Sequence, residues 1–107
     1  MLKFVVILYR RSDMSPDQFN DYFQNVHGPL ADKIPGLKKY IQNYVIADPK
    51  RKHPGWDGIA ELYFANWKEM ESGWASHQGE VATNDLNEFV DLEKTSWSVV
   101  EENSIRL

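Results

Sequence analysis

The sequence predicts an α+β domain in which a four-stranded antiparallel sheet carries its helices on one face. Short apolar runs rich in β-branched and aromatic residues alternate with helix-start signals along the 107 residues, a length typical of a single domain over 1–107. The predicted order is strand, helix, strand, strand, helical segment and strand. This order is the split βαβ, or ferredoxin-like, arrangement.

Composition and charge exclude several classes of protein. Apolar residues make up 42% of the chain, which argues against disorder, and the net charge of −4 argues against a nucleic-acid surface. No apolar run approaches the ~20 residues of a membrane span, and 2–9 lacks the features of a secretory signal. The chain has no cysteine, so it has no disulfide or thiolate site, and we expect a cytoplasmic protein.

The first strand and the first helix have strong local signals. The segment Leu2–Tyr9 is β-branched and aromatic, and both of its alternating faces are largely apolar, so we expect a strand covered on both sides. A helix is predicted to begin soon afterwards, because Ser15 can cap it, Pro16 suits its first position and Gln18 completes a capping box.

The apolar stripe of this helix has a histidine at its edge. Projection at about 100° per residue puts His27 beside a stripe made of Phe19, Phe23, Val26 and Leu30. We expect Gly28-Pro29 to interrupt the helix, because proline disfavours helical geometry in the residue before it. A further helical turn is expected over 31–34.

The second half of the chain supplies the remaining strands and helices. In order, we expect a strand over 37–47, a polar loop over 48–55, a strand over 56–65, a helix from Trp67 that Gly73 ends or bends, a helical piece over 76–88 and a strand over 97–105. The strand over 56–65 alternates cleanly between its two faces. A capping pair, Asn66 and Glu69, marks the start of the helix that follows.

The predicted sheet has more apolar surface than its own helices can cover. All helices in this topology lie on one side, yet the first strand is apolar on both faces. Exposed apolar area costs about 25 cal/mol per Å², and the same face of a second copy can cover it. The sequence therefore predicts a homodimer whose two sheets pack together as a barrel.

Several motifs, taken in their order, resemble one family. They are the N-terminal strand, Met-Ser-Pro-Asp-Gln-Phe at 14–19, His-Gly-Pro-Leu at 27–30, Pro-Gly-Leu at 35–37 and Asp-Gly-Ile-Ala-Glu-Leu-Tyr-Phe at 57–64. Together they resemble the EthD family of the dimeric α+β barrel superfamily over nearly the whole chain. The resemblance implies a homodimer of ferredoxin-like subunits, each with a pocket between helices and sheet.

The resemblance also implies a range of chemistry. Related barrels include cofactor-free monooxygenases, lactone isomerases and polyketide cyclases or decarboxylases, and EthD proteins are often associated with catabolism. The family signature carries over to His27, Pro29, Leu30, Asp57 and Glu61. The sequence lacks the heme-binding pattern of some distant barrels, so no cofactor is expected.

His27 is the candidate catalytic residue, as a general acid/base. Its unperturbed pKa of about 6.5 suits proton transfer near neutral pH, although a histidine at a helix end can equally serve as a structural cap. Asp57 and Glu61 lie about 13 Å apart along a strand, too far for a carboxylate pair, but one of them could orient His27. We expect Tyr22 to be a packing residue rather than a partner of His27.

Aromatic and polar residues supply the candidate binding positions. Most aromatic side chains belong in the core or an interface, and a few can line an apolar pocket. The candidate binding residues are Tyr9, Tyr40, Trp56, Asp57, Glu61, Tyr63, Trp74 and His77. The three histidines have no metal-ligand spacing and there is no Gly-rich phosphate loop, so neither a metal nor a nucleotide is expected.

Three functions remain open at this point. The first is a small cofactor-independent enzyme in which His27 moves a proton on an apolar or aromatic small molecule, by isomerisation, cyclisation, decarboxylation or oxygenation. The second is a non-catalytic accessory protein that binds a small molecule and needs no titrating group. The third is a purely structural dimer without a cavity.

Overall fold

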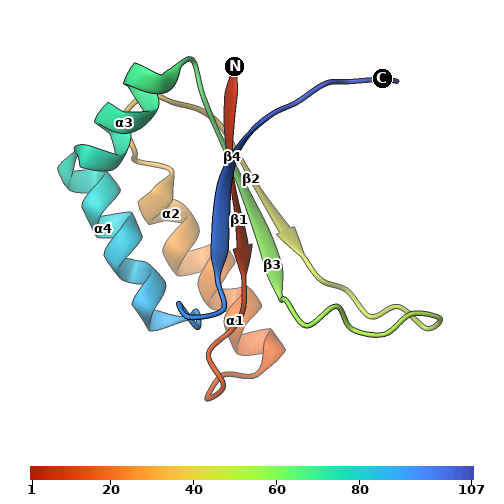
Figure 1. Ribbon diagram of the computed structural model, residues 1–107. Coiled ribbons are helices and arrows are strands. Elements are labelled where there is room, and N and C mark those ends of the chain that lie inside the picture. Colours follow the sequence, from red (N-terminus) through yellow and green to blue (C-terminus); the bar gives the residue numbers. More distant parts are fainter.

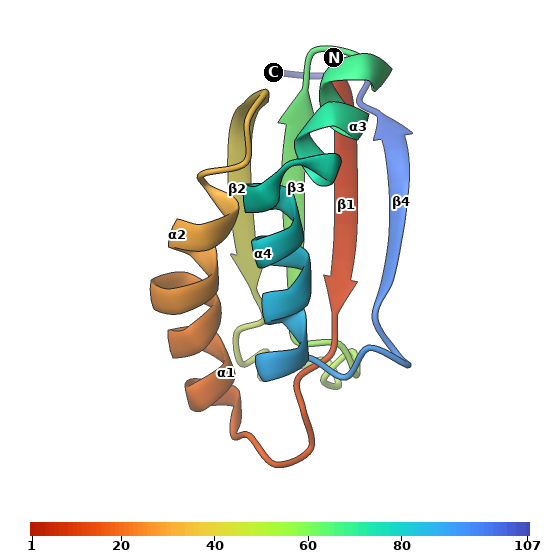
Figure 2. The same cartoon turned by 90° about the vertical axis from the view of Figure 1, so that its left-hand side faces the viewer.

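The four strands form one antiparallel sheet that carries every helix on the same face (Figure 1). The computed structural model describes residues 1–107. Its elements are β1 (Leu2–Leu8), α1 (Pro16–Tyr22), the π-helical turn η1 (Phe23–His27), α2 (Gly28–Ala31), β2 (Leu37–Tyr44), β3 (Gly58–Phe64), α3 (Trp67–Ala75), α4 (His77–Asp85), the 3₁₀ turn η2 (Leu86–Glu88) and β4 (Ser96–Glu101). The strand order is β2-β3-β1-β4, which Figure 2 shows from the helical side. The predicted ferredoxin-like class is confirmed.

Side-chain caps start the helices where the sequence predicts them. The capping box of α1 is complete, because Ser15 Oγ accepts from the Gln18 N–H at 3.1 Å and Gln18 Oε1 accepts from the Ser15 N–H at 2.8 Å. Gly73 does not end α3, which continues to Ala75. The break comes at Ser76, whose extended backbone and hydroxyl cap α4.

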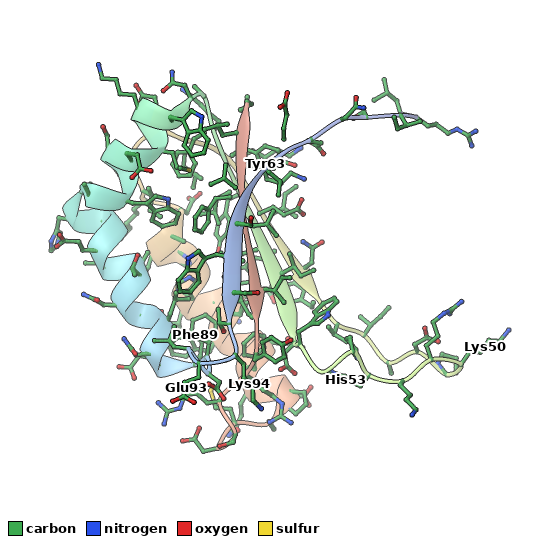
Figure 3. The ribbon with its side chains drawn as sticks, in the orientation of Figure 1. Lys50, His53, Tyr63, Phe89, Glu93 and Lys94 are labelled. Atoms are coloured by element: carbon green, nitrogen blue, oxygen red, sulfur yellow. The ribbon has the colours of Figure 1, made fainter.

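Three predicted strands, those over 37–47, 56–65 and 97–105, are shorter in the structure. Beyond Tyr44 and before Gly58, the chain leaves the sheet in a loop that projects away from the helices, with Lys50 at its tip and His53 on the part that returns to β3 (Figure 3). At the other end, β4 stops at Glu101 because Glu101 already lies opposite Leu2, the first residue of β1. The C-terminal tail also extends away from the helical side (Figure 1).

The helix that carries His27 continues where an interruption was expected. The chain passes from α1 through the wider turn η1 into α2, and the Gly28 N–H bonds to Phe23 O, five residues back. Proline lacks an N–H and crowds the preceding turn of a regular helix, and a π turn accommodates it. The wider turn shifts the buried face by one residue, so His27 is 6% exposed whereas Val26 is 42% exposed.

The core lies between the helices and the sheet, and the opposite face of the sheet lacks such a cover. The large side chains that are fully buried are Phe19, Phe23, Phe64, Phe89 and Leu8. The outer face is apolar at Val5, Ile7 and Ile59, with an ion pair in which Lys3 Nζ lies 2.8 Å from Glu61 Oε1. No helix has the length and apolar character that crossing a membrane requires.

Candidate functional site

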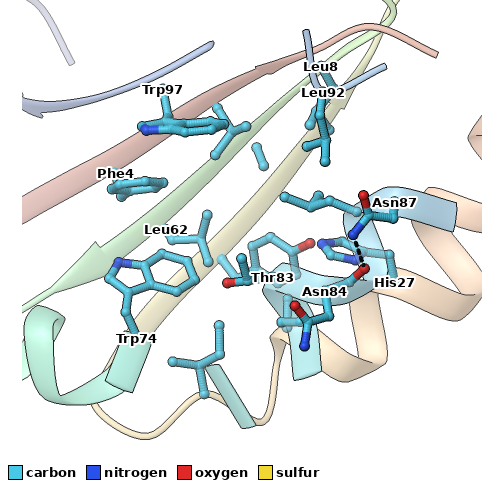
Figure 4. A pocket seen from close by; sticks show the side chains of 17 residues that line it. Phe4, Leu8, His27, Leu62, Trp74, Thr83, Asn84, Asn87, Leu92 and Trp97 are labelled. Carbon is cyan, nitrogen blue, oxygen red and sulfur yellow. Dashed lines mark hydrogen bonds between the residues drawn. The ribbon is translucent and has the colours of Figure 1, made fainter. Parts of the chain in front are cut away.

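A cavity of about 340 Å³ lies between the sheet and the helices, at the lower end of the range for small-molecule sites. Hydrophobic side chains make up 13 of its 17 lining residues. Figure 4 shows Phe4, Trp74 and Trp97 on one side of it and His27, Asn84 and Asn87 on the other. The cavity therefore has an aromatic end and a polar end.

The aromatic end is built from β1, α3 and β4. The rings of Phe4 and Trp74 pack at a centroid distance of 4.9 Å, tilted by 55°. Trp97 is 56% exposed although it lines the cavity, so it lies where the cavity meets solvent. The indole Nε1 of Trp74 is buried without a hydrogen-bond partner, which is rare in folded proteins.

The polar end contains a hydrogen-bonded chain of three side chains. His27 Nδ1 lies 3.0 Å from Asp85 Oδ2, and the Tyr22 hydroxyl donates to Asp85 Oδ1 at 2.7 Å. The ring of His27 packs on Phe89 at a centroid distance of 4.8 Å. The carboxylate that orients His27 is thus Asp85, and the expectation that Asp57 or Glu61 could do so is wrong. Tyr22 is a partner in this chain, not only a packing residue.

Burial and hydrogen bonding together set the proton positions at this end. Burial lowers the pKa of His27, and Asp85 opposes this shift only in part, so the imidazole is neutral near pH 7. Because the carboxylate accepts at Nδ1, we assign the ring proton to Nδ1. The other nitrogen, Nε2, has no hydrogen-bond partner in the protein. Burial and Asp85 raise the pKa of Tyr22 to about 12, so Tyr22 stays a donor.

Two of the eight candidate binding residues, Tyr40 and Trp74, line this cavity with His27. Glu61 and Tyr63 do not, because residues alternate along β3 and these two lie on the outer face, where Glu61 pairs with Lys3.

The remaining four candidates lie at the ends of strands and helices, outside the cavity lining. Asp57 is buried beside the start of β3, where its carboxylate accepts from the Arg10 N–H at 2.9 Å. Trp56 directly precedes it and Tyr9 directly follows β1, so neither belongs to the cavity-facing part of a strand. His77 is exposed in the first turn of α4.

The sequence reasoning missed Asp85 and the polar residues of α4 and η2. Ala82, Asp85, Leu86 and Phe89 follow the i, i+3, i+4, i+7 spacing of one helix face, and this signal could have placed Asp85 toward the core. No group of three or more histidine, cysteine, aspartate or glutamate side chains is arranged to hold a metal ion.

Comparisons with known proteins agree with this architecture. A family model described as the EthD domain matches residues 11–93. A comparison with curated protein sequences gave no significant match. Among solved structures, an ethyl tert-butyl ether D (EthD) family protein from Bacillus halodurans superposes with a TM-score of 0.80 at 20% identity, covering 96% of this chain and 100% of that chain.

Two further solved structures share the fold at lower identity. A dimeric ferredoxin-like protein from Bacteroides fragilis has a TM-score of 0.69 at 16% identity, covering 94% of this chain and 95% of that one. SnoaB, a cofactor-independent oxygenase from Streptomyces nogalater, has a TM-score of 0.65 at 10% identity, covering 96% and 93%. These structural likenesses show the fold alone, whereas the family match extends over most of the chain. The protein therefore belongs to the EthD family.

Proposed function

We propose that this protein is a small cofactor-independent enzyme that transfers a proton on an apolar or aromatic molecule, with His27 as the general acid/base. The observation that carries the proposal is that His27 lines a mainly apolar cavity while its Nδ1 is hydrogen-bonded to Asp85, which lies outside the lining. A structural cap would need neither a cavity beside the ring nor a free ring nitrogen.

Three features of the geometry support the proposal of general-base catalysis. Nε2 of the neutral imidazole accepts the proton, and the Asp85 carboxylate stabilises the imidazolium that results. The Tyr22 hydroxyl binds the second oxygen of Asp85 and holds the carboxylate in place. Isomerisation, cyclisation and cofactor-independent oxygenation can begin with removal of a proton from carbon, whereas in a decarboxylation the protonated His27 would deliver a proton to the carbon that has lost CO₂. SnoaB, which has the same fold, is a cofactor-independent oxygenase, and this likeness supports the proposal.

We further propose that two copies assemble through the outer faces of their sheets. This face holds the apolar side chains Val5, Ile7 and Ile59 around the Lys3–Glu61 pair, and one relative of the same fold is described as dimeric. A dimer mass in light scattering at micromolar concentration supports the proposal, and Ile59→Arg is expected to give the monomer. A wild-type monomer would contradict it.

The catalytic proposal can be tested with a model ketone. Solvent deuterium exchange into 2-tetralone, followed by proton NMR, reports proton removal from carbon without knowledge of the natural substrate. His27→Asn keeps a donor for Asp85 but has no titrating group, and we expect it to slow exchange by about a hundredfold. The matched control is His77→Asn, because His77 is exposed on α4 and lies outside the cavity lining.

The alternative of a non-catalytic binder gives a different result. Such a protein would bind 2-tetralone with an affinity that is independent of pH and of His27, and it would not accelerate exchange. Equal exchange by the wild type and His27→Asn would remove His27 from the mechanism.

A further inference from the structure

Tyr40 lies on the wall of the same cavity as His27. It belongs to β2 opposite Leu62, on the sheet face that points toward the helices. It lines the cavity and also a second, mainly polar hollow, which it forms with Gln42 and Tyr44 among others. What its hydroxyl can do there depends on the neighbouring amide of Gln42.

The amide of Gln42 has one allowed orientation. Gln42 Nε2 lies 2.8 Å from Phe23 O and 2.8 Å from the Tyr40 oxygen. A backbone carbonyl can only accept, so the atom facing Phe23 O must be the NH₂ group. The amide oxygen, on the other side, accepts from the Tyr44 hydroxyl.

This orientation leaves the proton of the Tyr40 hydroxyl unused. Both hydrogens of the Gln42 NH₂ are engaged, one on Phe23 O and one on the Tyr40 oxygen. The Tyr40 oxygen is therefore an acceptor within the protein, and no protein group accepts its hydrogen. Burial raises the pKa of Tyr40 to about 12, so the hydroxyl keeps that hydrogen near neutral pH.

The π turn that ends at His27 also anchors Gln42, the hydrogen-bond partner of Tyr40. Phe23 O, which anchors Gln42, also accepts the Gly28 N–H that closes the π turn ending at His27. Gly28 favours this close approach, because a Cβ at this position would lie 3.1 Å from Gln42 Nε2 and 3.3 Å from Phe23 O, so Gln42 would have to shift by a few tenths of an ångström. The base and the free hydroxyl are thus fixed relative to each other by shared contacts.

We propose that Tyr40 donates its free hydroxyl hydrogen to an oxygen of the substrate, and that the substrate is an enolisable carbonyl compound with an apolar or aromatic ring system. The aromatic end of the cavity would take the ring, and the carbonyl would lie at the end held by Tyr40 and His27. This inference rests on the proposed function and adds the chemical class of the substrate to it.

The step is a balanced proton transfer. His27 Nε2 takes a proton from the carbon next to the carbonyl, and the C–H pair forms a carbon–carbon double bond. The π pair of the carbonyl moves onto its oxygen, where the Tyr40 hydroxyl stabilises the charge. Return of the proton from Nε2 to the same or another carbon restores the imidazole and consumes no co-reactant.

A pair of probes that differ by one oxygen tests the inference. Binding of 2-tetralone and of tetralin, which lacks the oxygen, is measured by titration calorimetry on wild type and on Tyr40→Phe. Loss of one hydrogen bond in Tyr40→Phe is expected to weaken the binding of 2-tetralone about fivefold to tenfold and to leave the binding of tetralin unchanged. The matched control is Tyr9→Phe, because Tyr9 lies outside the cavity lining.

A second substitution tests the hydrogen bond without removing the hydroxyl group. Placing 3-fluorotyrosine at position 40 makes the hydroxyl a stronger donor, so 2-tetralone should bind more tightly while tetralin does not. Equal effects on the two probes, no effect on either, or a wild type that does not prefer the ketone would overturn the inference.

Failure of this inference and failure of the proposed function give different patterns. Normal exchange in His27→Asn, with ketone preference lost in Tyr40→Phe, would reject His27 as the base and keep Tyr40 as the donor. Slow exchange in His27→Asn, with ketone preference intact in Tyr40→Phe, would keep the base and reject the donor.

Discussion

Asp85→Asn is the sharpest test of the hydrogen-bonded chain at the polar end of the cavity. The wild-type carboxylate accepts from two donors, His27 at 3.0 Å and Tyr22 at 2.7 Å. An asparagine offers one oxygen and one NH₂ group, so only one of the two donors can keep its acceptor. The imidazolium that forms when His27 takes a proton also loses its negative partner.

The expected loss follows from the strength of the bond to the charged ring. A hydrogen bond to a charged group is worth about 1.5–3 kcal/mol, and this interaction is fully developed only after proton transfer. Exchange into 2-tetralone should therefore slow by about tenfold to a hundredfold in Asp85→Asn. Binding of 2-tetralone should change by less than about twofold, because Asp85 does not line the cavity.

An NMR titration of His27 provides the second readout. Asp85 raises the pKa of His27 against the lowering effect of burial, so Asp85→Asn should move this pKa further down. The matched control for both readouts is Asp91→Asn, since it makes the same change of side chain outside the lining of the cavity. Unchanged exchange, or a pKa of His27 that rises, would refute the assignment of Asp85 as the partner of the base.

Three further predictions concern stability. Burial lowers the pKa of His27 below about 6.5 in the folded state, so the folded protein binds this proton less readily than the unfolded chain. The free energy of unfolding, measured with urea, should therefore be highest above pH 6.5 and decline as the pH falls through the folded pKa. His27→Asn should flatten this decline. Gly73→Ala should lower the melting temperature, because the added Cβ would lie 2.7 Å from the Pro35 carbonyl oxygen, a conflict of about 1–3 kcal/mol. The control Ser72→Ala, at an exposed position, should leave the melting temperature unchanged. Equal melting temperatures for Gly73→Ala and the wild type would contradict the packing argument. Ser15→Ala should cost about 1 kcal/mol in urea unfolding through loss of the capping box, and a change below a few tenths would show that the cap is dispensable.

The elements that could be predicted from the sequence are those with local signals. The capping box at Ser15 and Gln18 and the alternation of Gly58, Ala60 and Leu62 involve neighbours a few residues apart, and the structure has both. Their order along the chain is enough to specify the ferredoxin-like sheet, because few topologies connect such elements.

The candidate site depended on two features without a simple local signal. The helical projection assumed a regular turn, and therefore placed Val26 inward and His27 at the edge, whereas the π turn reverses their exposure. Asp85 lies 58 residues from His27 along the chain, and only the packing of α4 against the first helix brings them together. Residue type alone predicts Tyr40 and Trp74 among eight candidates, because aromatic residues are frequent pocket walls, but it does not fix which face of a strand meets the helices.

Because of the π turn, the position of the His27 imidazole depends on the number of residues between Phe23 and His27. Deleting a single residue between Phe23 and His27 would allow an ordinary helix to form with nearly the same buried aromatic face. The imidazole would rotate toward the rim of the helix, away from Asp85, while the sheet and its remaining contacts stayed as they are. A chain shortened by one residue in this turn would therefore fold but lack the hydrogen bond between His27 and Asp85.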